Sequence, residues 1–172
     1  HALVQRLADP NKPQGLDTQL FLIEEVRDFQ QSQSNHFPEL ETAAEALWQD
    51  VGLRREDLYQ GLTGHLQSVY GIGAKVMPVD IMGETLRRYD FHRKRVLLSE
   101  MLSTPGRNFQ LAVQLALAAH GELLDRMVDK AKLSSPDAEK LCRIGLAGYF
   151  AGAVLMPYDD FLTSAKELRY DL

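Results

Sequence analysis

Apolar residues recur three or four positions apart between residues 17 and 70, which is the spacing of one face of an α-helix. The three stripes are Phe21, Leu22, Val26 and Phe29; Leu40, Ala43, Ala44, Leu47 and Val51; and Leu58, Leu62, Leu66 and Val69. Asp17 is a preferred N-cap type for the first stripe, Pro38 suits the first turn of the second, and Gly71 ends the third. We therefore predict three helices in this part of the chain.

The pattern changes between residues 72 and 99, where apolar positions alternate with others as they do in β-strands. Ile72, Ala74 and Val76 alternate first, and two further short runs at 85–89 and 95–98 flank a predicted turn. Pro78 either ends the first strand or confines it to a sheet edge, because proline lacks the N–H that a ladder needs. These features predict a small antiparallel sheet.

Two longer, mostly apolar segments follow the predicted sheet. Between residues 109 and 119 only Gln110 and Gln114 are polar, so this helix is expected to be buried around most of its circumference. The helix-start signals are Thr104–Pro105 and Ser135–Pro136. The second helix is expected to end before Pro157 and to pack against the first, at the centre of a mostly helical α+β domain.

The composition narrows the classes of partner. The chain has 172 residues, of which 45% are apolar and 25% charged, and its formal net charge of −5 disfavours a nucleic-acid binder held by bulk charge. The longest apolar run, residues 144–158, is shorter than the roughly 20 residues that cross a bilayer. The single cysteine, Cys142, excludes an internal disulfide and fits a reducing compartment. We expect a cytoplasmic location and no membrane partner.

The ends of the chain suggest a piece of a longer protein. Residues 1–16 contain Pro10, Pro13 and Gly15 and are predicted to be a linker without a secretion signal. Residues 17–172 are predicted to form a single domain, because no repeat or low-complexity segment interrupts them.

No metal site is expected from the histidines or the cysteine. The five histidines are scattered, and no two are separated by three or four residues, so no helical turn presents an adjacent pair. A hydrogen-bonded structural role is favoured for His65 and His120, and packing is favoured over nucleophilic chemistry for Cys142.

A local positive charge marks the predicted hairpin between residues 84 and 95. Its basic residues are Arg87, Arg88, Arg93, Lys94 and Arg95, against Glu84 and Asp90. Guanidinium groups suit phosphates, and the rings of Tyr89 or Phe91 could stack on a base. The alternative is a solvated edge strand whose charges prevent aggregation, and the residues alone favour this alternative over a phosphorylated ligand.

The apolar segment 144–158 is typical of a buried helix, but its glycines leave space beside bulky neighbours. Tyr149, Phe150 and Met156 could line a pocket for a short acyl group. Composition alone favours the alternative, in which these side chains belong to the core.

Two segments resemble the ImmA/IrrE-type metallopeptidases. Residues 107–117, Arg-Asn-Phe-Gln-Leu-Ala-Val-Gln-Leu-Ala-Leu, are similar to that family's zinc-binding helix, and residues 147–157 are similar to its second conserved helix. The resemblance places Val113 and Leu117 at the ligand positions, Gln114 at the general base and Leu146 near the third ligand. It therefore implies a zincin-like fold that lacks the zinc site.

The chain from Leu20 to its end also resembles the short-chain fatty acyl-CoA transcriptional regulators. The segments that carry this resemblance are 86–90, 109–112, 149–153, 156–158 and 168–171. It implies a sensor domain that binds coenzyme A (CoA) thioesters. In that family a helix-turn-helix DNA reader precedes this region and a cysteine-bearing region follows it, so DNA would be contacted only through a domain missing here.

The residues and the resemblance together lead to one functional expectation. The chain is expected to be the effector domain of a bacterial regulator of fatty-acid or propionate metabolism genes, without catalytic residues, metal or cofactor. Arg87, Arg88 and Arg93 are expected to pair with CoA phosphates, while Tyr89, Tyr149, Phe150 and Tyr158 border the acyl and thioester pocket.

Two other functions remain as alternatives. The chain could be a protein-interaction or dimerisation module, and we expect a homo-oligomer in either case. An active zinc metallopeptidase is the third possibility, although it requires metal ligands that the matching positions lack.

Overall fold

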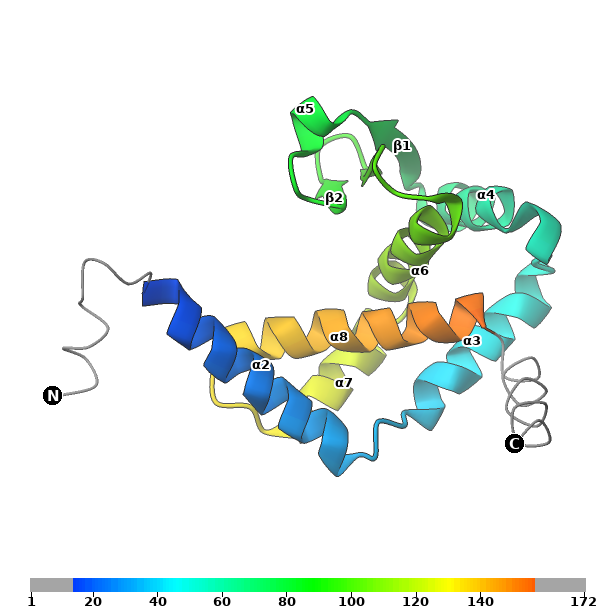
Figure 1. The fold of residues 1–172 in the computed structure, drawn as a ribbon. Helices are drawn as coiled ribbons and strands as arrows, with labels where there is room; N and C mark the ends of the chain where they lie inside the picture. The colour runs from blue at the N-terminus through cyan, green and yellow to red at the C-terminus, as the bar shows by residue number, and fades with distance from the viewer. Residues whose placement is uncertain (1–13, 157–172) are drawn as a thin grey trace, which may run out of the picture.

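The computed structural model describes residues 14–156 of the chain (Figure 1). Its elements in order are the helices α2 (Gln14–Ser32), α3 (Pro38–Val51), the short 3₁₀ helix η1 (Arg55–Asp57), α4 (Leu58–Tyr70), the strand β1 (Gly73–Met77), α5 (Val79–Met82), the strands β2 (Arg87–Asp90) and β3 (Arg95–Ser99), and the helices α6 (Thr104–Ala119), α7 (Gly121–Ala131) and α8 (Pro136–Leu155). Most of the predicted linker, residues 1–13, lies outside the described residues. Helix α2 already begins at Gln14, three residues before the predicted cap.

Local chemistry explains where most of these helices start and stop. Pro38 occupies the first turn of α3, and Gly71 ends α4 in the left-handed conformation that glycine adopts without strain. The hydroxyl of Ser103 accepts from the backbone N–H of Gly106, so the cap of α6 is Ser103, one residue before the predicted Thr104. Ser135 caps α8 in the same way, as predicted.

The sheet is mixed, with the order β1-β3-β2. β2 and β3 form the predicted antiparallel hairpin, with Arg88 opposite Leu97. The prediction of antiparallel pairing is wrong for β1, which runs parallel to β3 with Gly73 opposite Arg95. The cause is topological: α5 and the following loop carry the chain across, so that β2 lies at the far edge and β3 enters the centre.

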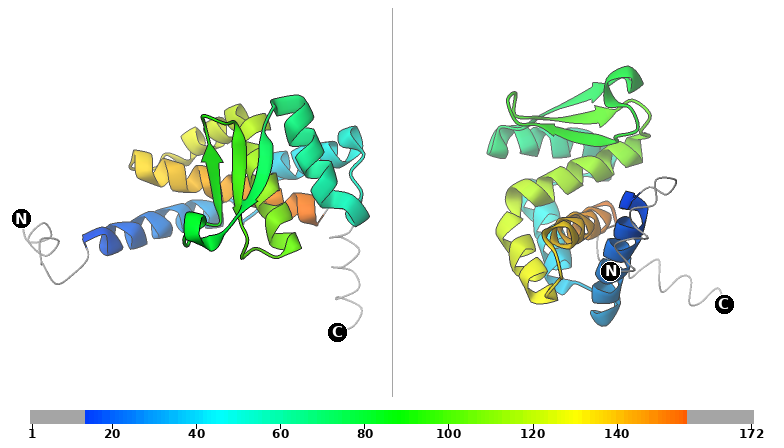
Figure 2. Two further views of the ribbon diagram at one scale, coloured as in Figure 1. Left: turned by 90° about the horizontal axis from the view of Figure 1, so that it is seen from above. Right: turned by 90° about the vertical axis from the view of Figure 1, so that its left-hand side faces the viewer.

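Three layers are visible when the molecule is seen from its end (Figure 2, right). The sheet forms the top layer, α4 and α6 lie beneath it, and α8 lies below α6 with α2, α3 and α7 around it. Helix α7 is an addition to the predicted elements. Its apolar residues Leu124, Met127 and Val128 are buried, whereas its outer face is polar.

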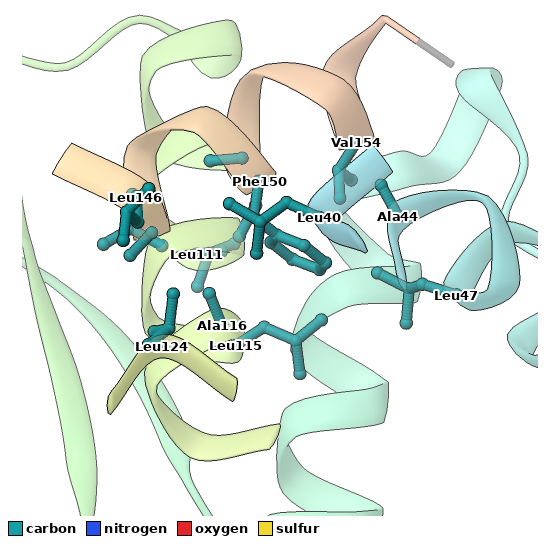
Figure 3. Close-up of a cluster of buried hydrophobic side chains, with 14 of the residues drawn as sticks. Leu40, Ala44, Leu47, Leu111, Leu115, Ala116, Leu124, Leu146, Phe150 and Val154 are labelled. Atoms are coloured by element: carbon teal, nitrogen blue, oxygen red, sulfur yellow. The ribbon is translucent and has the colours of Figure 1, made fainter. Parts of the chain in front are cut away.

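The core lies mainly between α6 and α8, as the two long apolar segments predicted (Figure 3). Its central side chains, drawn and labelled in that view, come from four helices: Leu40, Ala44 and Leu47; Leu111, Leu115 and Ala116; Leu124; and Leu146, Phe150 and Val154. Burial of each large apolar side chain contributes about 1.5–3 kcal/mol. The mostly helical α+β fold is therefore confirmed. Within residues 14–156, no helix has the length and apolar character to cross a bilayer.

Candidate functional site

The middle of α6 carries the positions that the peptidase resemblance assigns to zinc binding. Val113 is 4% exposed and Gln114 5% exposed, while Leu117 packs against the core. Leu146, near the position of the third ligand, is fully buried on α8. Aliphatic side chains offer zinc no lone pair, so these residues do not fit the metal. No group of three or more His, Cys, Asp or Glu side chains gathers anywhere in the described part of the chain.

An arginine from the sheet contacts Gln114, which stands where the peptidase resemblance places the general base. Nη1 of Arg87, on β2, donates to Oε1 of Gln114 at 2.7 Å. Burial lowers the pKa of Arg87, but a guanidinium stays protonated at any physiological pH. This charged hydrogen bond joins the sheet to the centre of α6.

The turn of the β2–β3 hairpin is organised by Asp90. Its Oδ1 accepts from the backbone N–H groups of His92 at 3.1 Å and Arg93 at 3.2 Å. The backbone hydrogen bond from Arg93 is the main cause that holds the pKa of Asp90 below its usual value. The bond from His92 acts in the same direction, and partial desolvation opposes both. Nη1 of Arg93 and Nε of Arg95 also lie 3.8 and 3.6 Å from Oδ2 of Asp90. One carboxylate therefore offsets part of the hairpin's positive charge.

The hairpin presents its cationic and aromatic groups on two faces. Arg88 is exposed, whereas Arg87 and Tyr89 are half-buried toward α6, as alternation along a strand requires. The rings of Tyr89 and Phe91 meet edge to face at 5.2 Å, and Phe91 is 80% exposed. Arg87, Arg88, Tyr89 and Arg93 are thus brought together on one short hairpin, as predicted from their sequence proximity.

Tyr149 lies elsewhere, beside a surface hollow of about 390 Å³ between α3 and α8. The hollow is lined by Asn35, Glu41, Ala44, Glu45, Tyr149, Gly152, Ala153 and Met156. The Tyr149 hydroxyl accepts from the backbone N–H of Phe37 at 3.3 Å, and the two rings pack edge to face at 5.1 Å. Burial is the main cause that raises the pKa of Tyr149.

The predicted acyl-pocket residues do not converge in this structure. Phe150 is fully buried in the core and packs against the ring of His120 at 5.3 Å, so it fills space rather than lining a hollow. Successive residues of a helix point about 100° apart, which is why Tyr149 and Phe150 face different surroundings. Tyr89 lies on the sheet, in another layer from Tyr149. Tyr158 lies outside the described residues.

A second polar hollow, which the sequence did not suggest, lies between the first turns of α4 and α6. It is lined in part by Tyr59, Thr104, Arg107 and Asn108. Thr104, Arg107 and Asn108 share one face of α6 by helical spacing, but no spacing rule connects them with Tyr59 on α4. Only Arg107 and Asn108, polar residues at the start of an otherwise apolar helix, were a visible signal.

Cys142 is fully buried on α8. Burial raises the pKa of its thiol to about 11, so little thiolate forms at neutral pH. This environment agrees with the packing role inferred from the sequence.

Curated relatives match 87% of this chain, and their names describe regulators. The HTH-type transcriptional regulators RamB and PrpR of Mycobacterium tuberculosis are each 36% identical to it over 149 residues. The propionyl-CoA carboxylase regulator of Cereibacter sphaeroides is 34% identical over 149 residues. The aligned region covers 31%, 30% and 31% of these three proteins, so the chain spans about a third of the length of the curated relatives it matches.

Structure and family comparison agree with these relatives. A solved Mycobacterium tuberculosis transcriptional regulator superimposes with a TM-score of 0.80 at 35% identity, covering 87% of this chain and 45% of that one. Both resemblances inferred from the sequence, to the ImmA/IrrE-type peptidases and to the acyl-CoA regulators, are thereby confirmed. Residues 67–172 match the family model described as the IrrE N-terminal-like domain, and the chain belongs to that family.

Proposed function

We propose that this chain is the sensor domain of a bacterial transcriptional regulator and that it binds a short-chain acyl-CoA rather than cleaving peptides. The main observation in support is the hydrogen bond that Arg87 donates to Gln114. It puts a guanidinium next to the position where a peptidase of this family would hold its general base. A fixed cation at that point favours an anionic ligand and disfavours zinc. The names of the regulator relatives support the same assignment, and one of them mentions propionyl-CoA carboxylase.

The phosphates of CoA are proposed to lie along the outer edge of β2. Within the described sheet β2 pairs with β3 alone, so no described strand pairs with its other edge. Arg87 and Arg88 reach such a ligand from the two faces of the strand, and Arg93 reaches it from the turn. The bond to Gln114 uses one of the five N–H donors of Arg87, and the exposed ring of Phe91 offers a surface on which a base can stack.

The uncharged acyl end is proposed to enter the hollow beside Tyr149. Ala44, Ala153 and Met156 give it apolar walls, while Glu41 and Glu45 repel phosphates. Arg87 and Tyr149 lie in different layers, so the two halves of the ligand would contact different surfaces and are tested separately. The core position of Phe150 removes it from this end, and Tyr149 borders the hollow; Tyr158, outside the described residues, stays part of the proposal.

The proposed role breaks no bond. A ligand that binds one arrangement of the domain better than another shifts the equilibrium between them by its differential affinity, typically about 1–3 kcal/mol. DNA contact would come from a helix-turn-helix domain in another part of a longer protein, acting in the cytoplasm on genes of fatty-acid or propionate metabolism.

Isothermal titration calorimetry with propionyl-CoA, CoA and free propionate tests the proposal. We expect propionyl-CoA to bind at least tenfold more tightly than propionate. Absence of heat with propionyl-CoA, or equal affinity for the two acyl compounds, would contradict acyl-CoA sensing.

A separate substitution tests the hollow beside Tyr149, where the acyl end is proposed to bind. Gly152 borders it, and a Cβ added there meets no atom within 4 Å, so Gly152→Leu is expected to fill the hollow without disturbing the helix. It should lower the affinity for propionyl-CoA at least fivefold and leave that for CoA unchanged. Gly64→Leu, at an equally open glycine of α4, is the matched control. Equal affinities in both variants would remove the hollow from the site.

A second candidate function is self-association through α2. Leu16, Leu20 and Ile23 recur at helical spacing on that helix, and each is more than 40% exposed. Exposed apolar stripes of this kind mark protein interfaces. Sedimentation with and without propionyl-CoA separates the two functions, because a pure interaction module would associate equally in both conditions.

A further inference from the structure

The hollow between the first turns of α4 and α6 has the features of a ligand site separate from the hairpin. Its volume is about 340 Å³, and it is lined by Arg55, Glu56, Leu58, Tyr59, Gln60, Thr104, Arg107 and Asn108. It lies in the middle layer, where α4 packs against α6. None of the hairpin arginines that we assign to CoA is among these lining residues.

Two residues that line this hollow each have a buried polar atom without a partner in the described residues. Asn108 is 9% exposed, and its Oδ1 makes no hydrogen bond to any residue the structure describes. Nε of Arg107 is buried and equally unpaired within residues 14–156. Buried polar atoms are almost always hydrogen-bonded in folded proteins. The structure therefore leaves Nε of Arg107 without an acceptor and Oδ1 of Asn108 without a donor, in two residues that line a hollow large enough for a ligand.

The electrostatic environment selects an anion as the acceptor. The first turns of α4 and α6 both line the hollow, and helix N-termini carry partial positive charge. The side chain of Asp57, the N-cap of α4, makes no cap hydrogen bond and pairs with Arg54 at 2.8 Å instead. Arg107 adds a full positive charge, and Glu56 adds an opposing negative one at the rim.

We propose that this hollow binds a phosphorylated ribose. The phosphate lies against Arg107 and the first turn of α4, where charge-assisted hydrogen bonds are strongest. A neighbouring ribose hydroxyl donates to Oδ1 of Asn108, which can only accept. The proposal does not depend on acyl-CoA sensing, because nothing in the hollow recognises an acyl chain.

Two kinds of molecule contain a phosphate beside a free ribose hydroxyl. CoA has a phosphate beside a free hydroxyl on its ribose, and a separate nucleotide with a 3′-phosphate has the same group. Adenosine 3′,5′-bisphosphate is therefore the probe, and its 2′-deoxy analogue lacks the hydroxyl donor. Adenosine and inorganic phosphate are the partial ligands.

Calorimetry on the full 172-residue chain tests the site with two variants. Arg107→Gln removes the charge, and Thr104→Glu places a carboxylate in the first turn of α6, where the helix dipole favours it and the fold is expected to persist. Arg27→Gln and Thr18→Glu, at exposed positions of α2, are the matched controls.

We expect both site variants to weaken binding of the bisphosphate at least tenfold and both controls to change it less than twofold. The 2′-deoxy analogue should bind at least threefold more weakly than the bisphosphate. A parallel loss of CoA affinity would identify CoA as the source and would move its ribose phosphate, though not its other two phosphates, from the β2 edge to this hollow. Unchanged CoA affinity would identify a separate nucleotide; either result supports the site.

Absence of bisphosphate binding, or equal affinity in wild type and Thr104→Glu, would overturn the proposal. This failure is distinct from failure of acyl-CoA sensing. Propionyl-CoA binding that depends on the hairpin arginines but not on Thr104 or Arg107 would remove this site and leave the proposed sensor function in place.

Discussion

The middle and the beginning of α6 differ in how far their polar side chains are satisfied within the described structure. In the middle, Val113 and Leu117 stand where the peptidase resemblance places metal ligands, and the side chain of Gln114 accepts a hydrogen bond from Arg87. At the beginning, Arg107 and Asn108 border an open polar hollow with unpaired atoms. Arg107 and Gln114 are two turns apart, about 10 Å along the helix. The middle of the helix is thus closed by packing and one hydrogen bond, whereas its beginning carries polar groups beside an open hollow.

Loss of packing against the middle of α6 should produce the largest change in the free energy of unfolding. Phe150→Ala removes a fully buried ring from the α6–α8 interface and is expected to lower the free energy of unfolding by about 3–5 kcal/mol. Met156→Ala, at a half-exposed position beyond the end of α8, should change it by less than about 0.5 kcal/mol. Urea denaturation measures both, and a loss below about 1 kcal/mol for Phe150→Ala would show that the interface is loosely packed.

The Arg87–Gln114 contact should come second. Gln114→Leu leaves a partly buried guanidinium without its acceptor, which is expected to cost about 1.5–3 kcal/mol. A double-mutant cycle with Arg87→Met isolates the pairwise part, because the second substitution removes the stranded charge. Additive effects in the denaturation experiments would mean that the contact does not hold the sheet to the helix.

At the beginning of α6, Ser103→Ala should have a smaller effect. It removes the side-chain acceptor of the Gly106 N–H and is expected to lower stability by about 0.5–2 kcal/mol. Ser68→Ala, at an exposed position inside α4, is the control and should be neutral or slightly stabilising because alanine favours a helix. Thermal unfolding that ranks the two variants in the opposite order would contradict the capping assignment.

The smallest effect should be a pH dependence that arises at the end of α6. Burial lowers the pKa of His120 and also that of His65. The unfolded chain therefore binds more protons than the folded one as the pH falls through about 6.5, and stability should decrease in that range. His120→Gln should flatten the dependence between about pH 7.5 and 5.5. An unchanged slope in denaturation midpoints would exclude His120 as its source.

The reactivity of Cys142 tests the burial of α8 without a measurement of stability. Its burial and its pKa of about 11 predict that a thiol reagent at pH 8 modifies it only after the chain unfolds. Stoichiometric modification of the native chain within minutes would show that α8 is more accessible than the structure describes.

Periodicity and start signals made much of the fold predictable. The stripes on α3 and α4, the Ser135–Pro136 start of α8 and the apolar run of α6 each reflect local rules, and the structure follows them. The parallel pairing of β1 was not predictable in this way, because it depends on where α5 carries the chain. α7 was missed because it follows α6 after a single residue, His120, that joins the two helices.

The candidate site was predictable only where its residues are close in sequence. The hairpin arginines were found from their local charge, whereas the partner of Arg87 is 27 residues away on another element. Arg107 and Asn108 gain their significance from α4, which no local pattern places beside them. The error at Phe150 had a local cause, since it and Tyr149 are helix neighbours that cannot share a face.

The affinity of propionyl-CoA for the Arg87→Met/Arg88→Gln double variant tests the central claim most directly. If the edge of β2 holds the phosphates, calorimetry should show an affinity at least tenfold below that of the unchanged chain, with Arg27→Gln within twofold of it. An unchanged affinity in the double variant, with the fold intact by circular dichroism, would contradict the claim that this sheet edge has become a CoA-binding surface.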